Sequence, residues 1–147
     1  MSIAVGTNSQ VFLLSTGNTS YAFGIDDRGL VRHLYWGKKL PSADELEMPV
    51  LTEVSTNDPV FEITPEEFPV HGGLRYKEHC LKVTFPDGTR ELVYQYDGYD
   101  TEQGDGWEEL VLHLKDEHYA FRMDLHYKLY PAYDLMERTV VLKNEME

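Results

Sequence analysis

The 147-residue sequence holds a single cysteine, Cys80, so no disulfide can form within the chain. It also lacks a long apolar run, and no stretch approaches the roughly 20 residues that a membrane-spanning helix needs. Residues 1–20 carry neither the basic start nor the apolar centre of a secretory leader. These absences favour a reducing compartment, and we expect a cytoplasmic location.

Basic residues are scarce as well, since 13 Lys and Arg stand against 26 Asp and Glu, which gives a net charge of −13. A chain of this charge repels phosphate backbones, so we expect no nucleic-acid partner. We expect no membrane partner either, because the apolar residues are scattered in short groups.

No convincing helix is indicated, and the clearest pattern is that of a strand. Residues 119–130, YAFRMDLHYKLY, alternate apolar and polar side chains, which predicts a strand with one buried face. Residues 110–114 and 135–143 read as its two neighbours, with residues 115–118 as a hairpin loop. The three strands together predict an antiparallel meander.

The remainder of the chain repeats this theme of short strands and turns. Further strands are predicted at residues 11–15, 20–25, 30–36, 81–85 and 91–96. Turn sequences separate them, such as Pro86-Asp-Gly-Thr, in which the glycine can adopt a positive φ. We therefore predict an all-β fold, an antiparallel, supersandwich-like β-sandwich with little or no helix, as a single domain over residues 1–147.

Two stretches break the strand pattern. Residues 41–69 are acidic and contain five of the chain's prolines, so any strands there are short or lie at an edge. Residues 99–106, YDTEQGDG, read as a polar loop.

Motifs that carry chemistry are missing. The chain has no GxSxG, GxGxxG or P-loop sequence, and Cys80 opens a predicted strand in which a small buried hydrophobe is its expected role. His71 and His79 lie near Cys80, but no CxxC or HxxxH spacing supports a zinc site, so we predict no metal and no cofactor. Acidic side chains are too numerous for their count to identify the carboxylate pair of a glycosidase.

Three stretches together resemble the N-terminal domain of glycoside hydrolase family 36, the melibiase-type α-galactosidases. They are residues 20–39 with His-Leu-Tyr-Trp-Gly at 33–37, residues 67–78 (EFPVHGGLRYKE), and residues 110–144. The second is similar to the family's Glu-Tyr-Pro…Gly…Asp-Phe/Tyr-Arg stretch. The likeness covers most of the chain in the same order.

This resemblance implies a large parent enzyme with an N-terminal β-supersandwich, a (β/α)₈ barrel and a C-terminal sheet domain. Such enzymes hydrolyse terminal α-D-galactosides with retention, using two aspartates on the barrel. We therefore expect neither catalytic aspartate within residues 1–147. The expected role of this chain is to pack on the catalytic barrel of the same polypeptide and to wall the sugar site. A homo-oligomer is expected for the full-length protein.

The resemblance also implies sugar-contacting residues. In tetrameric members, a loop of this domain reaches a neighbouring subunit's sugar through an acidic residue and an arginine. The matching segment, residues 48–61, offers only Glu53 and Asp58 and has no arginine. In the second stretch, Arg75 stands where the family has an aspartate, and Lys77 where it has an arginine.

The candidates for substrate binding are thus Tyr76, Lys77, Arg75, Trp36, Glu53 and Asp58. Two other functions stay open. The chain could be a stand-alone carbohydrate-binding β-sandwich, which holds sugars on exposed aromatic rings, or an interaction domain without a sugar role. The strand predicted at residues 135–143 is expected to have an unpaired edge that favours self-association.

Overall fold

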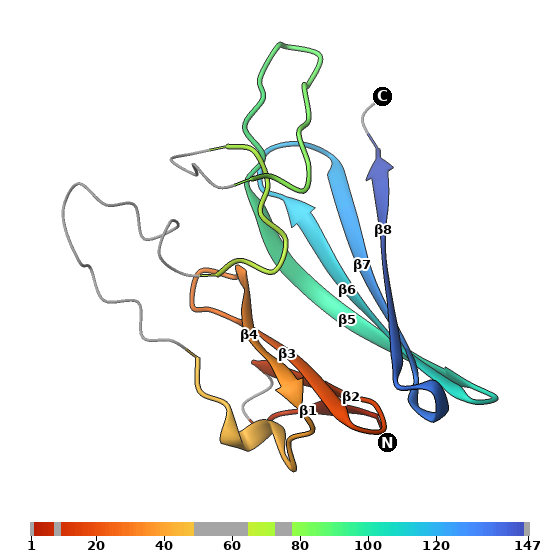
Figure 1. Ribbon diagram of the computed structural model, residues 1–147. Helices are drawn as coiled ribbons and strands as arrows, with labels where there is room; N and C mark the ends of the chain where they lie inside the picture. The colour runs from red at the N-terminus through yellow and green to blue at the C-terminus, as the bar shows by residue number, and fades with distance from the viewer. Residues whose placement is uncertain (1, 8–9, 49–64, 73–77, 146–147) are drawn as a thin grey trace.

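The computed structural model describes residues 2–7, 10–48, 65–72 and 78–145, and they form two four-stranded antiparallel sheets (Figure 1). The first sheet contains, in order, β1 (Ile3–Val5), β2 (Val11–Ser15), β3 (Thr19–Ile25) and β4 (Val31–Lys38). The second contains β5 (Tyr94–Gly104), β6 (Trp107–Asp116), β7 (Phe121–Tyr130) and β8 (Leu135–Asn144). Helix in the described residues is limited to two 3₁₀ turns, η1 (Ala43–Glu45) and η2 (Pro131–Tyr133). The predicted all-β sandwich is confirmed.

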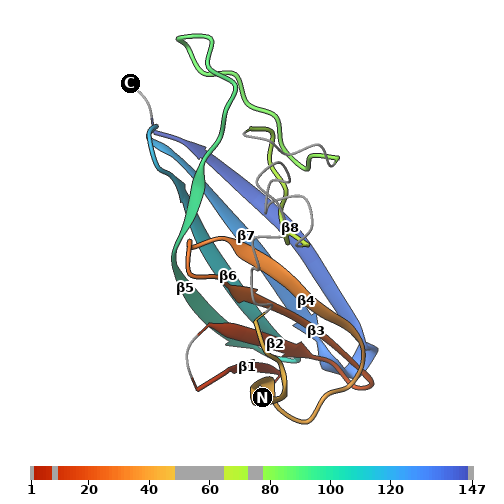
Figure 2. The same ribbon diagram turned by 90° about the vertical axis from the view of Figure 1, so that its left-hand side faces the viewer.

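The two sheets lie face to face, and the core fills the space between them (Figure 2). The alternation predicted for β7 is observed, because its inner side chains are all buried: Phe121, Met123, Leu125, Tyr127 and Leu129. Phe23 of β3 stacks on Tyr127, with ring centroids 4.9 Å apart, and on Phe12 of β2 at 5.3 Å. Aromatic contacts therefore join the middle strands of both sheets.

The outer faces of the two sheets differ. The outer face of the first sheet is covered by the segment around η1, and a second apolar cluster forms there from Val11, Leu13, Ala22 and Ala43. This sheet is thus buried on both faces, which explains the unbroken apolar run Val-Phe-Leu-Leu in β2.

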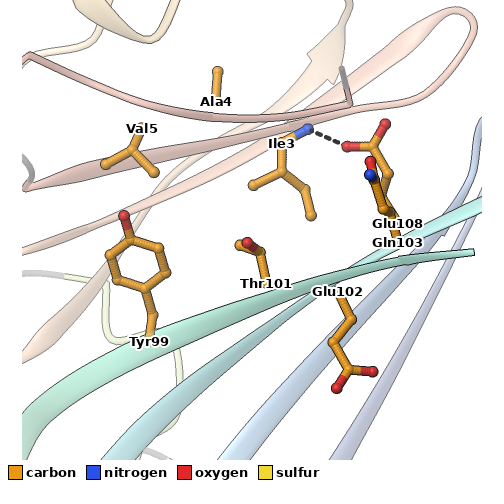
Figure 3. A pocket seen from close by; sticks show the side chains of 8 residues that line it. All are labelled: Ile3, Ala4, Val5, Tyr99, Thr101, Glu102, Gln103 and Glu108. Atoms are coloured by element: carbon orange, nitrogen blue, oxygen red, sulfur yellow. Dashed lines mark hydrogen bonds between the residues drawn. The ribbon is translucent and has the colours of Figure 1, made fainter.

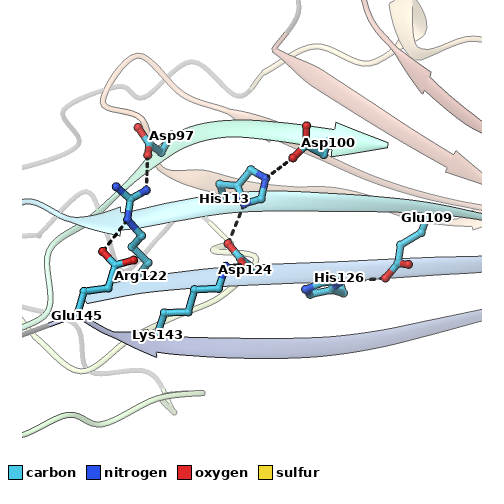
Figure 4. Close-up of polar contacts among 9 residues, drawn as sticks. All are labelled: Asp97, Asp100, Glu109, His113, Arg122, Asp124, His126, Lys143 and Glu145. Carbon is cyan, nitrogen blue, oxygen red and sulfur yellow. Dashed lines mark hydrogen bonds and ion pairs between the residues drawn. The ribbon is translucent and has the colours of Figure 1, made fainter. Parts of the chain in front are cut away.

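The outer face of the second sheet carries a network of polar side chains instead (Figure 4). His113 of β6 lies between Asp124, at 2.7 Å from Nδ1, and Asp100, at 3.0 Å from Nε2. Asp124 is also 2.5 Å from the Nζ of Lys143 on β8. The hydrogen bond with Asp124, aided by Asp100 and opposed by partial burial, raises the pKa of His113.

Several local predictions are wrong. Residues 99–106 do not form a polar loop, because β5 continues to Gly104 and pairs with β6 up to Trp107. The predicted strand at residues 81–85 is irregular apart from a bridge between Leu81 and Val70. The strand predicted at 91–96 begins only at Tyr94.

The expected burial of Cys80 is wrong as well. The cysteine is exposed, because the segment that carries it runs along the surface as a cover over the core and is no sheet strand. The turn at Pro86-Asp-Gly-Thr is confirmed: Gly88 has a φ of +87° and its N–H donates to the carbonyl of Phe85 at 2.9 Å.

The raised pKa of His113 predicts a pH-dependent contribution to stability. A group whose pKa is higher in the folded state stabilises the fold fully below its unfolded pKa, and this stabilisation is lost as the pH rises through the folded pKa. Replacing His113 with glutamine should therefore cost more unfolding free energy at about pH 5 than at about pH 9. The difference should stay below about 1 kcal/mol, because the ring is partly exposed and water screens the charges.

Urea denaturation of both proteins at the two pH values measures this difference. The matched control is His118→Gln, since His118 is an exposed histidine in the β6–β7 loop. Equal losses for His113→Gln at both pH values would contradict the assignment.

Candidate functional site

The candidate site lies at the side of the sandwich where β4 and β8 form the two sheet edges. Residues 65–67 run antiparallel to β4 here: the N–H of His33 donates to the carbonyl of Pro65 at 3.1 Å, and the N–H of Glu67 donates to that of Val31 at 3.0 Å. Because these backbone bonds fix the segment, the side chain of Glu67 is directed between the sheets, where it is 1% exposed.

The Glu67 carboxylate binds side chains from four strands. The hydroxyl of Tyr21 on β3 donates to both oxygens, at 2.8 and 2.7 Å, and that of Tyr127 on β7 donates to Oε1 at 2.8 Å. Nη2 of Arg138 on β8 lies 3.3 Å from Oε1 and donates to the Glu67 carbonyl at 2.8 Å. Nδ1 of His33 on β4 lies 3.3 Å from Oε2. We call these five residues the Glu67 cluster.

The electrostatics of the Glu67 cluster keep its two tyrosines and its arginine protonated. Burial, reinforced by the negative charge of Glu67, raises the pKa of both Tyr21 and Tyr127. Burial by itself lowers the pKa of the Arg138 guanidinium, but the electrostatic interactions with Tyr127 and Glu67 outweigh this effect, so the pKa is raised. Both carboxylate oxygens are therefore occupied by donors, which suits a cross-link between the sheets and does not suit a general base.

Trp36 of β4 lies beside this cluster. Its side chain is 75% exposed, and its ring meets that of Tyr21 edge to face at 6.0 Å. The side chains of His33 and Arg138 are 31% and 33% exposed, so the cluster reaches the surface near Trp36. An exposed indole next to two partly exposed polar groups can stack on a sugar and bind its hydroxyls.

Trp36 is the one candidate from the sequence that falls within the described residues. Arg75, Tyr76, Lys77, Glu53 and Asp58 lie outside them. Their assignment to the sugar site stays a prediction.

Sequence reasoning missed the role of the Glu67 cluster. Glu67 entered only as part of a motif, and its partners lie far away in sequence, with 46 residues to Tyr21 and 71 to Arg138. One signal was available: Tyr127 stands among the inward positions of an otherwise apolar strand face, and a buried phenol hydroxyl needs an acceptor.

A cleft of about 570 Å³ opens on the opposite side of the sandwich, between β1 and β5 (Figure 3). Tyr99, Thr101 and Gln103 face β1 across it, whereas Glu102 points away. Glu108 is already engaged, because it accepts from the N–H groups of Ser2 at 2.9 Å and Ile3 at 3.3 Å. The cleft therefore does not present the two facing carboxylates that glycoside hydrolysis needs.

Other candidate features are accounted for within the described residues. The Nζ of Lys128 lies 3.8 Å from the ring centroid of Trp107, so this face of the indole is covered. His71 and His79 touch edge to face at 5.0 Å, yet no group of three His, Cys, Asp or Glu side chains that could hold a metal occurs in the described part of the chain. No helix there has the length and apolar character to cross a membrane.

Comparison with known proteins gives a consistent picture. The family model described as "Glycosyl hydrolase family 36 N-terminal domain" matches residues 29–147. The bifunctional α-galactosidase/sucrose kinase AgaSK of Mediterraneibacter gnavus is 23% identical over 98% of this chain and 18% of its own length. The α-galactosidase Mel36A of Lactobacillus acidophilus is 26% identical over 95% of this chain and 22% of its own length. The chain thus spans about a fifth of these relatives.

Solved structures share the fold. The GH36 α-galactosidase AgaB from Geobacillus stearothermophilus matches with a TM-score of 0.83 at 20% identity, over 99% of this chain and 23% of that one. The galactosidase domain of AgaSK also matches with a TM-score of 0.83, at 23% identity, over 97% of this chain and 23% of that one.

The Glu67 cluster predicts a large loss of stability when its acceptor is removed. Glu67→Gln should lower the free energy of unfolding by about 3–5 kcal/mol, because it leaves Arg138 without its carboxylate. Tyr127→Phe should cost less, about 1.5–3 kcal/mol, since it removes one hydrogen bond to a charged group. Urea denaturation measures both, with Glu45→Gln as the exposed control. A loss below about 1 kcal/mol for Glu67→Gln would be incompatible with this cross-link.

Proposed function

This chain belongs to the glycosyl hydrolase family 36 N-terminal domains, and on that basis we propose that it is the non-catalytic N-terminal domain of an α-galactosidase. The observation that carries the proposal is the family match over residues 29–147. The curated relatives are named α-galactosidases, and this chain covers only 18% and 22% of their lengths. The reaction, hydrolysis of terminal α-D-galactosides, is therefore assigned to a catalytic (β/α)₈ barrel of the same polypeptide, which carries the aspartates.

The domain's own task in this proposal is to pack on the barrel and to form one wall of the sugar site. The Glu67 cluster supports it, because it fixes the edge strands β4 and β8 relative to each other. A wall built on fixed strands keeps its side chains in place without further ordering when substrate binds. Trp36, held at its edge by Tyr21, then offers an indole face to the apolar side of a galactose ring.

The remaining sugar contacts are proposed for residues outside the described part of the chain. Tyr76 and Lys77 come first, with Arg75, Glu53 and Asp58 as further candidates. Lys77 would donate to a sugar hydroxyl or pair with a barrel carboxylate, although it lacks the two-pronged geometry of an arginine. Homo-oligomerisation of the full-length protein and a cytoplasmic location complete the proposal.

The first test is the size and activity of the native polypeptide. An antibody raised against this domain should detect, on a denaturing gel, a band several-fold larger than 17.0 kDa. That protein should hydrolyse aryl α-galactosides, and the 147-residue chain alone should not. A native band near 17.0 kDa would remove the barrel from the proposal. Measurable oligosaccharide binding by the isolated chain would then favour a stand-alone carbohydrate-binding module.

The second test addresses Trp36 in the intact enzyme. Trp36→Ala should lower kcat/KM for an α-galactoside by about threefold to tenfold, the loss expected for one aromatic stacking contact. Tyr133→Ala is the matched control, because Tyr133 is similarly exposed, at 79%, but lies in η2 at the β7–β8 turn. Equal kcat/KM values for the two variants would exclude Trp36 from the sugar site.

A further inference from the structure

The cleft between β1 and β5, which we call the β1–β5 cleft, interrupts the apolar interior of the sandwich (Figure 3). The inner side chains of β6 include Leu110 and Leu112, which are fully buried. Residues directly opposite each other in an antiparallel pair share a face of the sheet. The inner positions of β5 opposite these leucines are Thr101 and Tyr99, and Gln103 is the next inner position. All three β5 side chains are exposed, so the core does not fill this part of the space between the sheets.

The polar lining of the β1–β5 cleft is uncharged and available for binding. Among the described residues, no hydrogen bond within the chain engages the hydroxyls of Tyr99 and Thr101 or the amide of Gln103. Each of these side chains can both donate and accept, which suits a ligand rich in hydroxyl groups. The opposite wall is apolar, because Ile3 and Val5 face β5. The cleft therefore matches a ligand with one apolar face and one polar face.

The carboxylates at the β1–β5 cleft are directed elsewhere or already engaged. Glu102 points away from it (Figure 3). Both oxygens of Glu108 accept from the N–H of Ser2 at 2.9 Å, and Oε2 also accepts from the N–H of Ile3 at 3.3 Å. These bonds tie β1 to β6, so the two walls are in place before a ligand arrives. Neither carboxylate is available to a cation, and the net charge of −13 repels an anion, so the lining favours a neutral ligand.

The β1–β5 cleft has the dimensions of a site for a small molecule. Its volume of about 570 Å³ lies within the range of ligand pockets, about 300–1,000 Å³. From Tyr99 to Gln103 the strand extends by about 13–14 Å, since each residue of an antiparallel strand adds about 3.4 Å. This length exceeds that of a single sugar ring and suits a chain of linked rings.

We propose that the β1–β5 cleft binds a neutral oligosaccharide, as a non-catalytic site separate from the wall that carries Trp36. The apolar faces of the sugar rings lie against the β1 wall, and their hydroxyls meet Thr101 and Gln103. The ring of Tyr99, which packs edge to face with Phe12 at 5.1 Å, bounds one end of the cleft. The choice of a sugar among neutral ligands of this kind rests on the proposed function, because an α-galactosidase encounters oligosaccharides.

Calorimetric titration of the intact polypeptide with a β-linked galactotetraose tests the site. This neutral tetrasaccharide contains no α-galactoside, so the enzyme does not consume it during the measurement. We expect saturable binding. Gln103→Ala should raise the dissociation constant roughly threefold to tenfold, the loss expected for one hydrogen bond. Tyr99→Ala should raise it by a similar factor of roughly threefold to tenfold, because it removes an aromatic contact.

Gln95→Ala is the matched control, because Gln95 is an exposed glutamine on the same strand and does not line the β1–β5 cleft. It should leave the dissociation constant unchanged. Absence of binding would refute the proposal, and so would binding that Gln103→Ala and Tyr99→Ala leave as strong as Gln95→Ala does.

Thiol labelling tests whether the β1–β5 cleft is open in the intact polypeptide. Thr101→Cys places a thiol in the cleft, and mass spectrometry of the digested protein follows its alkylation beside that of Cys80, which is exposed and lies outside the cleft. Tetrasaccharide at four times its dissociation constant should slow alkylation of the introduced thiol about fivefold and leave that of Cys80 unchanged. An introduced thiol that does not react would mean that another part of the polypeptide fills the cleft, which would overturn the proposal.

Hydrolysis of an aryl α-galactoside by the unaltered polypeptide separates this proposal from the proposed function. A polypeptide that hydrolyses the glycoside but does not bind the tetrasaccharide would refute the sugar site in the β1–β5 cleft alone. A polypeptide that binds the tetrasaccharide through Tyr99 and Gln103 but does not hydrolyse the glycoside would refute the proposed function and support the site.

Discussion

One buried carboxylate determines how the two sheets are placed. Glu67 accepts hydrogen bonds or ion pairs from β3, β4, β7 and β8. The apolar core holds the sheets together, yet apolar contacts are non-directional and tolerate sliding. The hydrogen bonds and ion pairs of Glu67 do not tolerate such sliding, because a shift of one sheet would leave a buried donor unpaired, and this costs free energy. Trp36 lies beside Tyr21 because the two are direct cross-strand partners in the pairing of β3 with β4, so the strand that Glu67 binds through Tyr21 also positions the indole.

The alternation of apolar and polar residues predicts a strand correctly where one face of that strand is buried. It does not predict the strand where pairing with a neighbouring strand determines the structure. The alternation over residues 119–130 predicts β7 because the core selects every second side chain. The polar residues 99–104 belong to β5 because pairing with β6 satisfies their backbone, whatever their side chains prefer. Residues 81–85 are apolar for another reason: Phe85 stacks on Tyr119 with centroids 3.7 Å apart and covers the core without joining a sheet.

The site was predictable only in part. Exposure of an aromatic such as Trp36 depends on which strand is at an edge, and strand order cannot be read from local patterns. The Glu67 cluster is even harder to predict from the sequence, because its members come from both halves of the chain. The family resemblance pointed to residues 67–78 through the motif there. The structural role of Glu67, the first residue of that motif, is evident only from its contacts with Tyr21 and Tyr127.

The order of strands has a consequence for how the molecule folds. In both sheets every strand pairs with its neighbour in sequence, so each sheet is a meander that closes only short loops. Local pairing of this kind carries a low entropic cost and speeds folding relative to Greek-key sandwiches. The segment around Glu67 lies between the two meanders in the sequence and also links them in space, through Tyr21 of the first sheet and Tyr127 of the second.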